Sequence, residues 1–547
     1  MIHFKKITQL LILSLIIVMG SCTKLNETFN SSLTSQQAAS SLGTAGTGLL
    51  LSAAYADIAG PFHSQDLLFS LEENTSDESL VPTRGGDWDD NGVWRVLHAQ
   101  TWNADHGQFL NVFNALNKLN FDATNVLAFS PTPAQAAEAK FLRALSLYYL
   151  LDLYGQYPFR NPGDNLLNPP EVKSGAAAID FIISELTASL PNVSASNPPN
   201  LANPDAVRAL LMKCYLQKGA FVNRAAPTFA AADMQQVISL GNAIIASGKY
   251  SFTPNYFDNF TVNNDVTSKE AIFRYMNTTG VSTNNGNMAG RWNMTLHYNS
   301  YTPNNPNAGW NGFSTISDFY NSFNVTGAPA TAFGPNDTLL DTRLGGRVLS
   351  NLNSTKTSGI RPGFLVNQQF NELGVPTKDR KGAPLAYTPT IASNMIETGS
   401  NLEVTGIRVV KYVPDYGAYG GPAGNDLMIF RYADVVLMVA EAKLRAGDVT
   451  LPTPLTMVND LRTARGAAPL AAIPLVNTAN VEDPTTLLAE RGRELYWESY
   501  RRTDLIRFGM YLKPWQYKTS TDPKNLVFPV PNQALAANPN LKQNAGY

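Results

Sequence analysis

The sequence has little cysteine, little charge and, after its first 21 residues, no apolar run that reads as a transmembrane helix. Only two of its 547 residues are cysteines, Cys22 and Cys214, which excludes a disulfide framework. Charged residues make up 15% of the chain and the formal net charge is −2, so no broad attraction to nucleic acid or anionic lipid is expected. Much of the polar surface must therefore come from Asn, Thr, Ser and Gln, which suits neutral, hydroxyl-rich ligands better than phosphates.

Motifs of the common enzyme classes are also missing. The sequence contains no His-Glu-x-x-His metal motif, no Gly-x-Ser-x-Gly nucleophile elbow and no phosphate-binding P-loop. Its five histidines lack metal-ligand spacing, and His98 and His106, eight residues apart, come closest to it. We therefore predict that the chain is not an enzyme and has no catalytic residues.

One enzyme hypothesis stays open because acidic residues lie near aromatic ones. Asp87, Asp89 and Asp90 surround Trp88 in the sequence. A glycoside hydrolase needs two carboxyl groups about 5–5.5 Å or 6.5–9.5 Å apart across its substrate. Nothing in the sequence sets two of these carboxylates opposite each other, so a surface glycoside hydrolase is the less favoured alternative.

The N-terminus has the layout of a secretory signal. A basic start at residues 5–6 precedes an apolar run at residues 10–19, which is shorter than the roughly 20 residues of a membrane span. The sequence that follows, Met19-Gly20-Ser21-Cys22, resembles a bacterial lipobox, with Met where Leu is commoner. We expect cleavage after residue 21 and attachment of acyl chains such as palmitate to Cys22, which would anchor the protein to a membrane. The alternative is an ordinary cleaved signal with an incidental cysteine.

The chain that remains after cleavage is long enough for a large core. Residues 22–43 are polar and rich in Ser, Thr and Asn, which predicts a flexible tether between the lipid and the fold. Usual domain sizes would divide the remaining 526 residues (547 − 21) into two or more domains. With Cys22 lipidated, Cys214 has no partner. It lies at helical spacing from Val207 and Leu211 and is interpreted as a small buried apolar residue.

Helical patterns dominate the first half of the chain. Thr132-Pro133-Ala134-Gln135 has the spacing of a capping box with proline at the first helical position, and the helix after it should end near Tyr154. Further helices are predicted near residues 104–120, 176–190, 204–218 and 233–247. Short Gly, Pro and Asn breaks set several of them in pairs, which is typical of helical-repeat arrays.

The middle of the chain, from about residue 250 to 425, loses helical periodicity and is rich in Gly, Pro, Asn and aromatic residues. Short strand-like runs occur at Ala271–Tyr275 and Ile407–Tyr412. A long irregular region in a compact protein is usually functional. Helices are predicted to resume at Leu427–Ala446, which should be buried because apolar residues surround it, and at about 485–507.

Charged residues in these two late helices fall at helical spacing. Arg431, Asp434 and Glu441 lie in the helix that should be buried, so we expect them to have partners inside the fold. Steps of three and four residues in the second helix predict a ladder of ion pairs between helices rather than a catalytic group. Its members are Glu490, Arg493, Glu494, Trp497, Arg501 and Asp504.

Four stretches, in this order, resemble the SusD/RagB family of Bacteroidetes outer-membrane lipoproteins. They are Ala139-Lys140-Phe141-Leu142-Arg143-Ala144 continuing to Leu153-Tyr154-Gly155, Arg431-Tyr432-Ala433-Asp434-Val435-Val436-Leu437-Met438 followed by Ala440-Glu441-Ala442, Glu490-Arg491-Gly492-Arg493-Glu494-Leu495 leading to Asp504-Leu505-Ile506-Arg507, and Phe528-Pro529-Val530-Pro531 with Asn538-Pro539-Asn540-Leu541-Lys542-Gln543-Asn544. Together with the lipobox, they extend the resemblance over essentially the whole chain.

The resemblance implies a mainly α fold, with tetratricopeptide-like helix pairs as scaffold and a loop-rich, partly β region that carries the ligand site. It implies one SusD-like domain over residues 44–547, against the expectation from length, with the scaffold at about 44–250 and 425–510 and the insert at about 250–425. It also implies no catalytic activity and no cofactor, and it leaves room for a structural cation at no particular residue.

The resemblance further implies a location and partners. Such proteins are lipid-anchored in the cell outer membrane, face the exterior, and deliver a bound glycan, or in RagB-like members a peptide, to a SusC-like TonB-dependent transporter. An acidic residue directly after the lipidated cysteine often accompanies surface export in this bacterial group. Here the first one is Glu27, so the surface location rests on the family resemblance. We expect an oligosaccharide or polysaccharide ligand and keep a peptide ligand as the alternative.

Two segments combine aromatic rings with hydrogen-bonding side chains, the mixture that sugar recognition needs. Residues 77–102 and 292–310 hold five of the seven tryptophans, of which Trp102 precedes a helix and is expected to be structural. Tyr298 and Trp310 are the best matches to an arc of aromatic residues that contacts sugar in the family's starch-binding type. The predicted ligand-binding residues are Trp88, Tyr298, Trp310, Arg84, Asp77, Asp89, Trp94, Trp292 and Tyr301.

Overall fold

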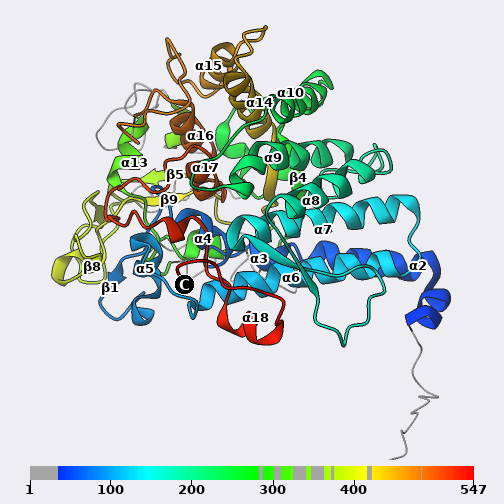
Figure 1. The fold of residues 1–547 in the computed structure, drawn as a ribbon. Coiled ribbons are helices and arrows are strands. Elements are labelled where there is room, and N and C mark those ends of the chain that lie inside the picture. The colour runs from blue at the N-terminus through cyan, green and yellow to red at the C-terminus, as the bar shows by residue number, and fades with distance from the viewer. Residues whose placement is uncertain are drawn as a thin grey trace, which may run out of the picture.

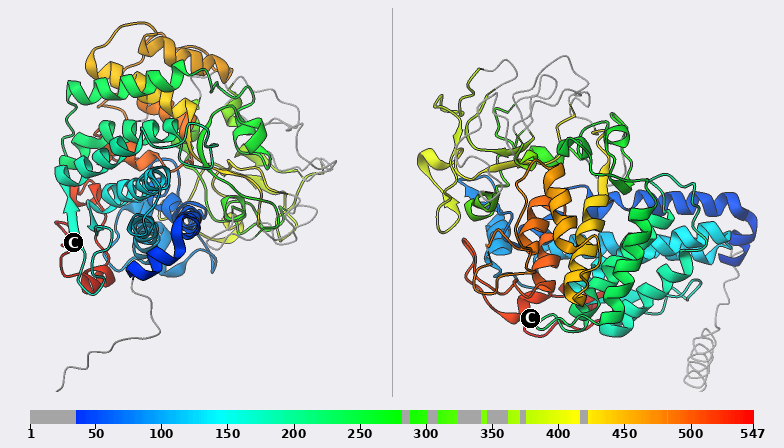
Figure 2. Two further views of the ribbon diagram at one scale, coloured as in Figure 1. Left: turned by 90° about the vertical axis from the view of Figure 1, so that its right-hand side faces the viewer. Right: turned by 90° about the horizontal axis from the view of Figure 1, so that it is seen from above.

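Helices packed one after another form one side of the molecule. The computed structural model describes residues 35–281, 288–300, 309–323, 341–345, 362–370, 375–415, 422–481 and 483–547. The helices of this array are α2 (Ser35–Ala56), α6 (Gly107–Ala128), α7 (Pro133–Tyr154), α8 (Gly175–Ser189), α9 (Pro204–Val222), α10 (Ala231–Ala246), α14 (Tyr432–Ala446) and α15 (Pro454–Ala464). Each of α6 to α9 packs against the next helix, α10 packs against α14, and α14 packs against α15 (Figures 1 and 2). The predicted array of helices is confirmed.

The helix α7 illustrates how local sequence sets this scaffold. The Thr132 hydroxyl accepts from the backbone N–H of Gln135, and the Gln135 side chain accepts from the backbone N–H of Thr132, so the predicted capping box is formed. Gly155 ends the helix with φ of 69°, a conformation that glycine adopts without strain. Every side chain from Phe141 to Tyr154 is buried, because α2, α6 and α8 pack against α7.

The prediction of a helix over Leu427–Ala446 is wrong for its first five residues. Residues Leu427–Arg431 form strand β10, which pairs antiparallel with β4 (Ala271–Tyr275), and α14 begins only at Tyr432. Local periodicity cannot distinguish a short apolar run that is a buried strand from the start of a buried helix. The predicted burial of this segment is confirmed.

The predicted helix at about 485–507 is interrupted. It divides into α16 (Leu487–Leu495) and α17 (Arg501–Arg507), because Trp497 and Ser499 have φ of 58° and 67°. Two buried carboxylates accept hydrogen bonds from the backbone N–H groups of this break. Glu73 accepts from the N–H groups of Ser499 at 2.6 Å and Tyr500 at 3.2 Å, and Glu78 accepts from that of Trp497 at 3.3 Å. Side chains more than 400 positions away thus replace the helical hydrogen bonds that the pattern predicted.

The charged ladder forms a buried network between elements, as predicted. The Glu494 carboxylate lies 2.6 Å from Arg431, 2.8 Å from Arg465 and 3.4 Å from Arg343, and all four residues are inaccessible to solvent or nearly so. Burial alone would raise the pKa of Glu494, but the charges of Arg465 and Arg431 outweigh it and lower that pKa to about 2. The carboxylate therefore stays ionised inside the fold.

The other predicted charges also have partners. Arg431 pairs with Glu270 at 3.0 Å as well as with Glu494. Asp434 pairs with Lys213 and Arg491, Glu441 pairs with Arg445 and Arg507, Asp504 pairs with Arg491 and Arg507, Arg501 pairs with Asp77, and Arg493 pairs with Glu490. These side chains form ion pairs and have structural roles. None of the charged residues of the predicted ladder is therefore free to act in catalysis.

Short paired strands occur mainly at the opposite end, on the left of Figure 1, where β1, β5, β8, β9, α5 and α13 lie. The parallel pair is β1 (Thr83–Arg84) with β8 (Ile396–Glu397); the other antiparallel pairs are β2 (Gln156–Phe159) with β3 (Glu171–Ser174), β5 (Gly363–Leu365) with β9 (Arg408–Val410), and β6 (Asn367–Gln368) with β7 (Ala386–Tyr387). The predicted strand at Ala271–Tyr275 is confirmed, and the one at Ile407–Tyr412 shortens to β9.

Short helices join these parts. The α-helices are α3 (Ala59–Phe62), α4 (Leu68–Glu73), α5 (Val93–Ala99), α11 (Asn264–Thr267), α12 (Gly290–Asn293), α13 (Ser317–Asn321) and α18 (Asn532–Ala537). The 3₁₀ turns are η1 (Asp90–Gly92), η2 (Tyr256–Asn259), η4 (Thr342–Leu344), η5 (Gly399–Asn401) and η6 (Pro523–Leu526). Among the described helices, none combines the length and apolar character that a membrane crossing would require.

The two cysteines have different outcomes. Cys214 is buried on α9 and burial raises the pKa of its thiol, which confirms its interpretation as a small core residue. Cys22 lies outside the described residues. The helix α2 begins at Ser35, within the segment 22–43 that composition predicts as a tether.

Candidate ligand-binding site

Arg84 fixes the base of a glycine-rich loop at the strand-bearing end. Its guanidinium donates to the carbonyls of Thr405 at 2.8 Å and Leu402 at 3.2 Å and to the hydroxyl of Ser314 at 3.2 Å. The Arg84 side chain was predicted to contact the ligand, but it is buried and not exposed to solvent. It instead joins three segments that are far apart in the sequence and holds the start of the loop.

Trp88 leaves this loop in an unusual backbone conformation. Its φ of 59° lies in the left-handed region, which is uncommon for a bulky side chain and costs of the order of 1 kcal/mol or more. Asp90 and Asn91 nearby have φ of 39° and 56°, and Asn311 on the facing segment has φ of 54°. Strained backbone of this kind clusters at functional sites, so this loop is a candidate for one.

The Trp88 ring is held by contacts on several sides. Its indole N–H donates to the carbonyl of Trp310 at 2.6 Å, and its ring meets Trp94 and Phe313 edge to face with centroids 5.6 Å apart in each pair. The ring packs so closely on Gly312 that a Cβ there would lie 2.3 Å from Trp88 Cε2. The two segments predicted from sequence therefore meet, and Trp310 itself remains 45% exposed beside Trp88.

Tyr298 joins the same surface through Asp87. The Tyr298 hydroxyl donates to the carboxylate of Asp87, the neighbour of Trp88 in the loop. The guanidinium carbon of Arg380 lies 3.8 Å from the centroid of the Tyr298 ring, a cation–π contact that covers one face of the ring. Tyr298 is thus held at both its hydroxyl and its ring. Burial and the bond to Asp87 raise the pKa of the phenol, which stays neutral.

A buried pair behind Tyr298 fixes Arg380. Glu403 accepts from Arg380 Nε at 2.8 Å and from His297 Nε2 at 2.7 Å, and His297 Nδ1 accepts from the backbone N–H of Asn299 at 3.0 Å. Burial lowers the pKa of His297 to about 4, so the imidazole is neutral and carries its proton on Nε2. Burial would raise the pKa of Glu403, but the hydrogen bonds from Arg380 and His297 lower it.

We call Trp88, Tyr298 and Trp310, with Asp87 and Arg380, the loop-end cluster. It presents aromatic surface next to an exposed carboxylate and a half-exposed guanidinium. Rigid apolar rings flanked by directional donors and acceptors suit ligands that have both C–H faces and hydroxyl or amide groups.

The remaining predicted contacts lie apart from this surface or at its edge. Asp77 is buried and both its oxygens accept from Arg501, at 2.6 and 2.7 Å, because it belongs to the internal ion-pair network. Trp94 and Trp292 are buried in the core, and the Trp94 ring packs edge to face against the Trp88 ring. Asp89 is half exposed and pairs with Arg95 at 3.2 Å. Tyr301 lies outside the described residues.

The acidic residues beside Trp88 each have a structural partner. Asp87 accepts from Tyr298, Asp89 pairs with Arg95, and Asp90 accepts from the Trp94 indole at 2.7 Å. These contacts stabilise the loop. Each carboxylate therefore has a structural role rather than a role in acid–base chemistry.

The two histidines that came closest to metal spacing are also engaged. His98 lies between the carbonyls of Ser79 and Gln516, and His106 caps α6 by accepting from the N–H of Gln108. In the part of the chain that the structure describes, no group of three or more His, Cys, Asp or Glu side chains could hold a metal ion.

Sequence reasoning missed Asp87 as a partner of Tyr298 and missed Arg380 and Glu403 altogether. Residues 380 and 403 lie in the irregular middle of the chain, where no periodic pattern or motif marks a polar residue as part of a site. Their role depends on contacts with a segment far away in the sequence, such as that of Arg380 with Tyr298, 82 positions apart, and that of Glu403 with His297, 106 positions apart. Only the aromatic residues of the segments 77–102 and 292–310 pointed to this surface.

Comparison with known proteins identifies similar sequences. A model described as the SusD family matches residues 269–547. The starch-binding protein SusD of Bacteroides thetaiotaomicron is 25% identical over 521 residues, which cover 88% of this chain and 85% of that protein. The match therefore extends over nearly the full length of both proteins.

Solved structures share the fold. A SusD-like protein from Bacteroides fragilis has a TM-score of 0.67 at 19% identity, over 92% of this chain and 97% of that chain. Surface glycan-binding protein A from Bacteroides fluxus has a TM-score of 0.62 at 18% identity, over 92% of this chain and 100% of that chain. The mainly helical fold with small sheets, predicted from sequence, is confirmed.

Proposed function

We propose, because this chain belongs to the SusD family, that it binds a glycan at the cell surface and delivers it to a SusC-like TonB-dependent transporter of the outer membrane. Members of this family are binding proteins without catalytic activity. The observation that carries the proposal is the loop-end cluster, where Trp310, Trp88 and Tyr298 present ring surface beside Asp87.

The names of the similar proteins support a glycan as the ligand. The Bacteroides thetaiotaomicron relative is a starch-binding protein, and the Bacteroides fluxus relative is a surface glycan-binding protein. Sugar rings stack their C–H faces on tryptophan and tyrosine, and their hydroxyls pair with carboxylates and amides. We propose Trp310 and Tyr298 as the stacking residues, with Asp87, Asp89 and Arg380 at hydrogen-bonding distance of the sugar. Buried Arg84 and Trp94 act as supports.

A RagB-like peptide ligand is the second candidate, and one experiment separates the two. The purified protein is applied in parallel to a glycan array and to a pool of uncharged and charged peptides. We expect saturable binding to a subset of neutral oligosaccharides and none to the peptides. Binding to peptides alone would contradict the glycan proposal, while the loop-end cluster could still be tested with the bound peptide.

Replacing Gly312 by Ala should weaken glycan binding about tenfold. The new Cβ would lie 2.3 Å from Trp88 Cε2 and 2.8 Å from the carbonyl oxygen of Met294, so the Trp88 ring has to move. Isothermal titration with the array-selected oligosaccharide measures the effect. Gly86→Ala is the matched control, since a Cβ at Gly86 meets no atom within 4 Å. Equal affinity of the two variants would show that the Trp88 position does not matter for binding.

The proposed surface location depends on Cys22. We expect Cys22→Ala to release the protein from membranes, because it removes the attachment point of the acyl chains, and to leave its affinity for the oligosaccharide unchanged. Fractionation in high salt, followed by titration of the released protein, measures both. A Cys22→Ala protein that stays with the membrane in high salt would contradict the lipid anchor.

A further inference from the structure

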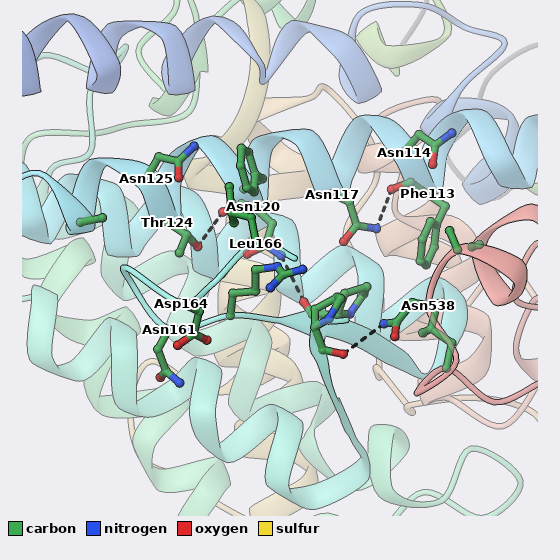
Figure 3. Close-up of a pocket in the computed structure, with 18 of the residues that line it drawn as sticks. Phe113, Asn114, Asn117, Asn120, Thr124, Asn125, Asn161, Asp164, Leu166 and Asn538 are labelled. Atoms are coloured by element: carbon green, nitrogen blue, oxygen red, sulfur yellow. Dashed lines mark hydrogen bonds between the residues drawn. The ribbon is translucent and has the colours of Figure 1, made fainter. Parts of the chain in front are cut away.

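A groove of about 540 Å³ runs along α6 and is lined by none of the loop-end cluster. Its other walls are the connection between β2 and β3 and the C-terminal segment around α18 (Figure 3). We call it the α6 groove. Its volume lies within the range of pockets that hold small organic ligands. It therefore has room for a short oligomer.

Side-chain amides follow one face of α6 along this groove. Asn114, Asn117 and Asn125 line the groove at helical steps of three and eight residues and span about 16 Å of the helix axis. Among the described residues, no hydrogen bond engages the side chains of Asn114 and Asn125, and the amide oxygen of Asn117 is likewise unused. Each amide offers donors and an acceptor to a ligand.

The charged groups of the α6 groove are hydrogen-bonded to the β2–β3 connection. The guanidinium of Arg160 donates to the carbonyls of Asn165 at 3.2 Å and Asn168 at 2.6 Å, and the carboxylate of Asp164 accepts from the N–H of Asn161 at 2.7 Å. Both residues stabilise the β2–β3 connection itself. The groove therefore favours an uncharged ligand over one recognised by its charge.

Apolar surface lies between the amides. Phe121, on the same face of α6, is 40% exposed, and Leu166 of the β2–β3 connection is 61% exposed. Pro158 and Pro170 complete this wall. Exposed apolar residues next to convergent polar groups are typical of a ligand site rather than of a solvated helix face.

The two prolines of the groove offer no free backbone group for strand addition. The carbonyl of Pro158 accepts from Asn120 at 3.2 Å and that of Pro170 accepts from Asn538 at 3.2 Å, and proline has no N–H to donate. An extended peptide binds chiefly through main-chain hydrogen bonds to such an edge. Recognition here falls to side-chain amides, which pair with hydroxyl groups as donors and acceptors.

We propose that the α6 groove is a second binding site for a neutral oligosaccharide, a proposal that rests on the proposed glycan-binding function. Asn114, Asn117 and Asn125 pair with its hydroxyls, and Phe121 and Leu166 cover its C–H faces. Two sites on one chain raise the avidity for a long polysaccharide, because the second contact becomes intramolecular.

The test applies four proteins to one glycan array of neutral oligosaccharides, beside a pool of uncharged peptides. They are the wild type, a loop-end variant Trp88→Ala/Tyr298→Ala/Trp310→Ala, the same variant with Asn114→Ala/Asn125→Ala, and the same variant with Asn111→Ala. Asn111 is exposed on α6 outside the groove and is the matched control. We expect the loop-end variant to keep a subset of neutral glycans, Asn111→Ala to change nothing, and the two groove changes to weaken the remaining binding about tenfold or more.

The outcomes separate the two proposals. A loop-end variant that binds no glycan, while the wild type does, overturns the α6 groove and leaves the proposed function intact. Remaining binding that the groove changes do not affect, or groove-dependent binding of peptides alone, also overturns it. A wild type that binds no glycan overturns both. Thermal unfolding of all four proteins verifies that each one is folded.

Discussion

Replacing Glu494 by Gln should lower the free energy of unfolding by about 3–5 kcal/mol, because breaking a buried ion pair leaves its partners uncompensated. Glu494 lies within 3.4 Å of Arg431, Arg465 and Arg343, and its side chain is 0% exposed. Chemical denaturation measures the change. Glu171→Gln is the control, since Glu171 is exposed on β3, and it should alter stability by less than about 0.5 kcal/mol. A similar small effect for Glu494→Gln would contradict a structural role of the network.

The same residue predicts a pH dependence. Its pKa is lowered from the ordinary value of 4.5 to about 2, so its stabilising effect is complete above pH 4.5. That effect is lost as the pH falls from about 4.5 to about 2, because the unfolded state binds the proton more tightly. The unfolding free energy of the wild type should fall over this window. The fall should be smaller in Glu494→Gln, and an equal slope in both proteins would contradict the assignment.

Replacing Trp88, Tyr298 and Trp310 together by Ala should abolish most glycan binding, with an affinity loss of about a hundredfold or more. These rings supply the stacking surface of the loop-end cluster, and Trp310 alone, 45% exposed, should account for at least about tenfold. Titration with the array-selected oligosaccharide measures the loss. The site assignment is wrong if all three changes leave full affinity.

A matched control distinguishes lost contacts from general damage. Tyr215→Ala removes a partly exposed tyrosine of α9 in the helical scaffold and should leave affinity unchanged. Tyr298→Phe keeps the ring and removes only the hydroxyl that donates to Asp87, so its effect should be smaller than that of Tyr298→Ala. Since Trp88 also packs on Trp94 and Phe313, the triple variant is compared with the wild type by thermal unfolding.

Much of the scaffold could be predicted because its signals are local. The cap at Thr132, the stop at Gly155 and the apolar spacing between them act over a few residues, and α7 follows them closely. The same holds for α8, α9 and α10, whose breaks contain Gly, Pro or Asn. Charged residues at helical spacing within apolar sequence likewise indicated buried ion pairs, since a buried charge requires a partner.

The errors lie where remote contacts override local preference. The break after α16 exists because Glu73 and Glu78 supply acceptors for the backbone N–H groups of Trp497 and Ser499. The strand β10 exists because β4, about 150 positions earlier, pairs with it. Neither partner can be identified from the periodicity of the segment itself.

The candidate site was predicted only in part, for the same reason. Aromatic clustering in two loop-like segments pointed to Trp88, Tyr298 and Trp310, and the structure brings these three together. The same clustering could not separate exposed rings from the buried Trp94 and Trp292. Nor could it show that Asp77 is engaged by Arg501, because that pair joins residues 424 positions apart.

A crystal structure of the complex with the array-selected oligosaccharide tests the central claim most directly. The account predicts a sugar ring stacked on Trp310 or Tyr298, with a hydroxyl within hydrogen-bonding distance of Asp87 or Arg380. An oligosaccharide bound in the α6 groove as well would agree with the second site. A complex in which the sugar lies elsewhere and touches none of Trp88, Tyr298 and Trp310 would contradict the account.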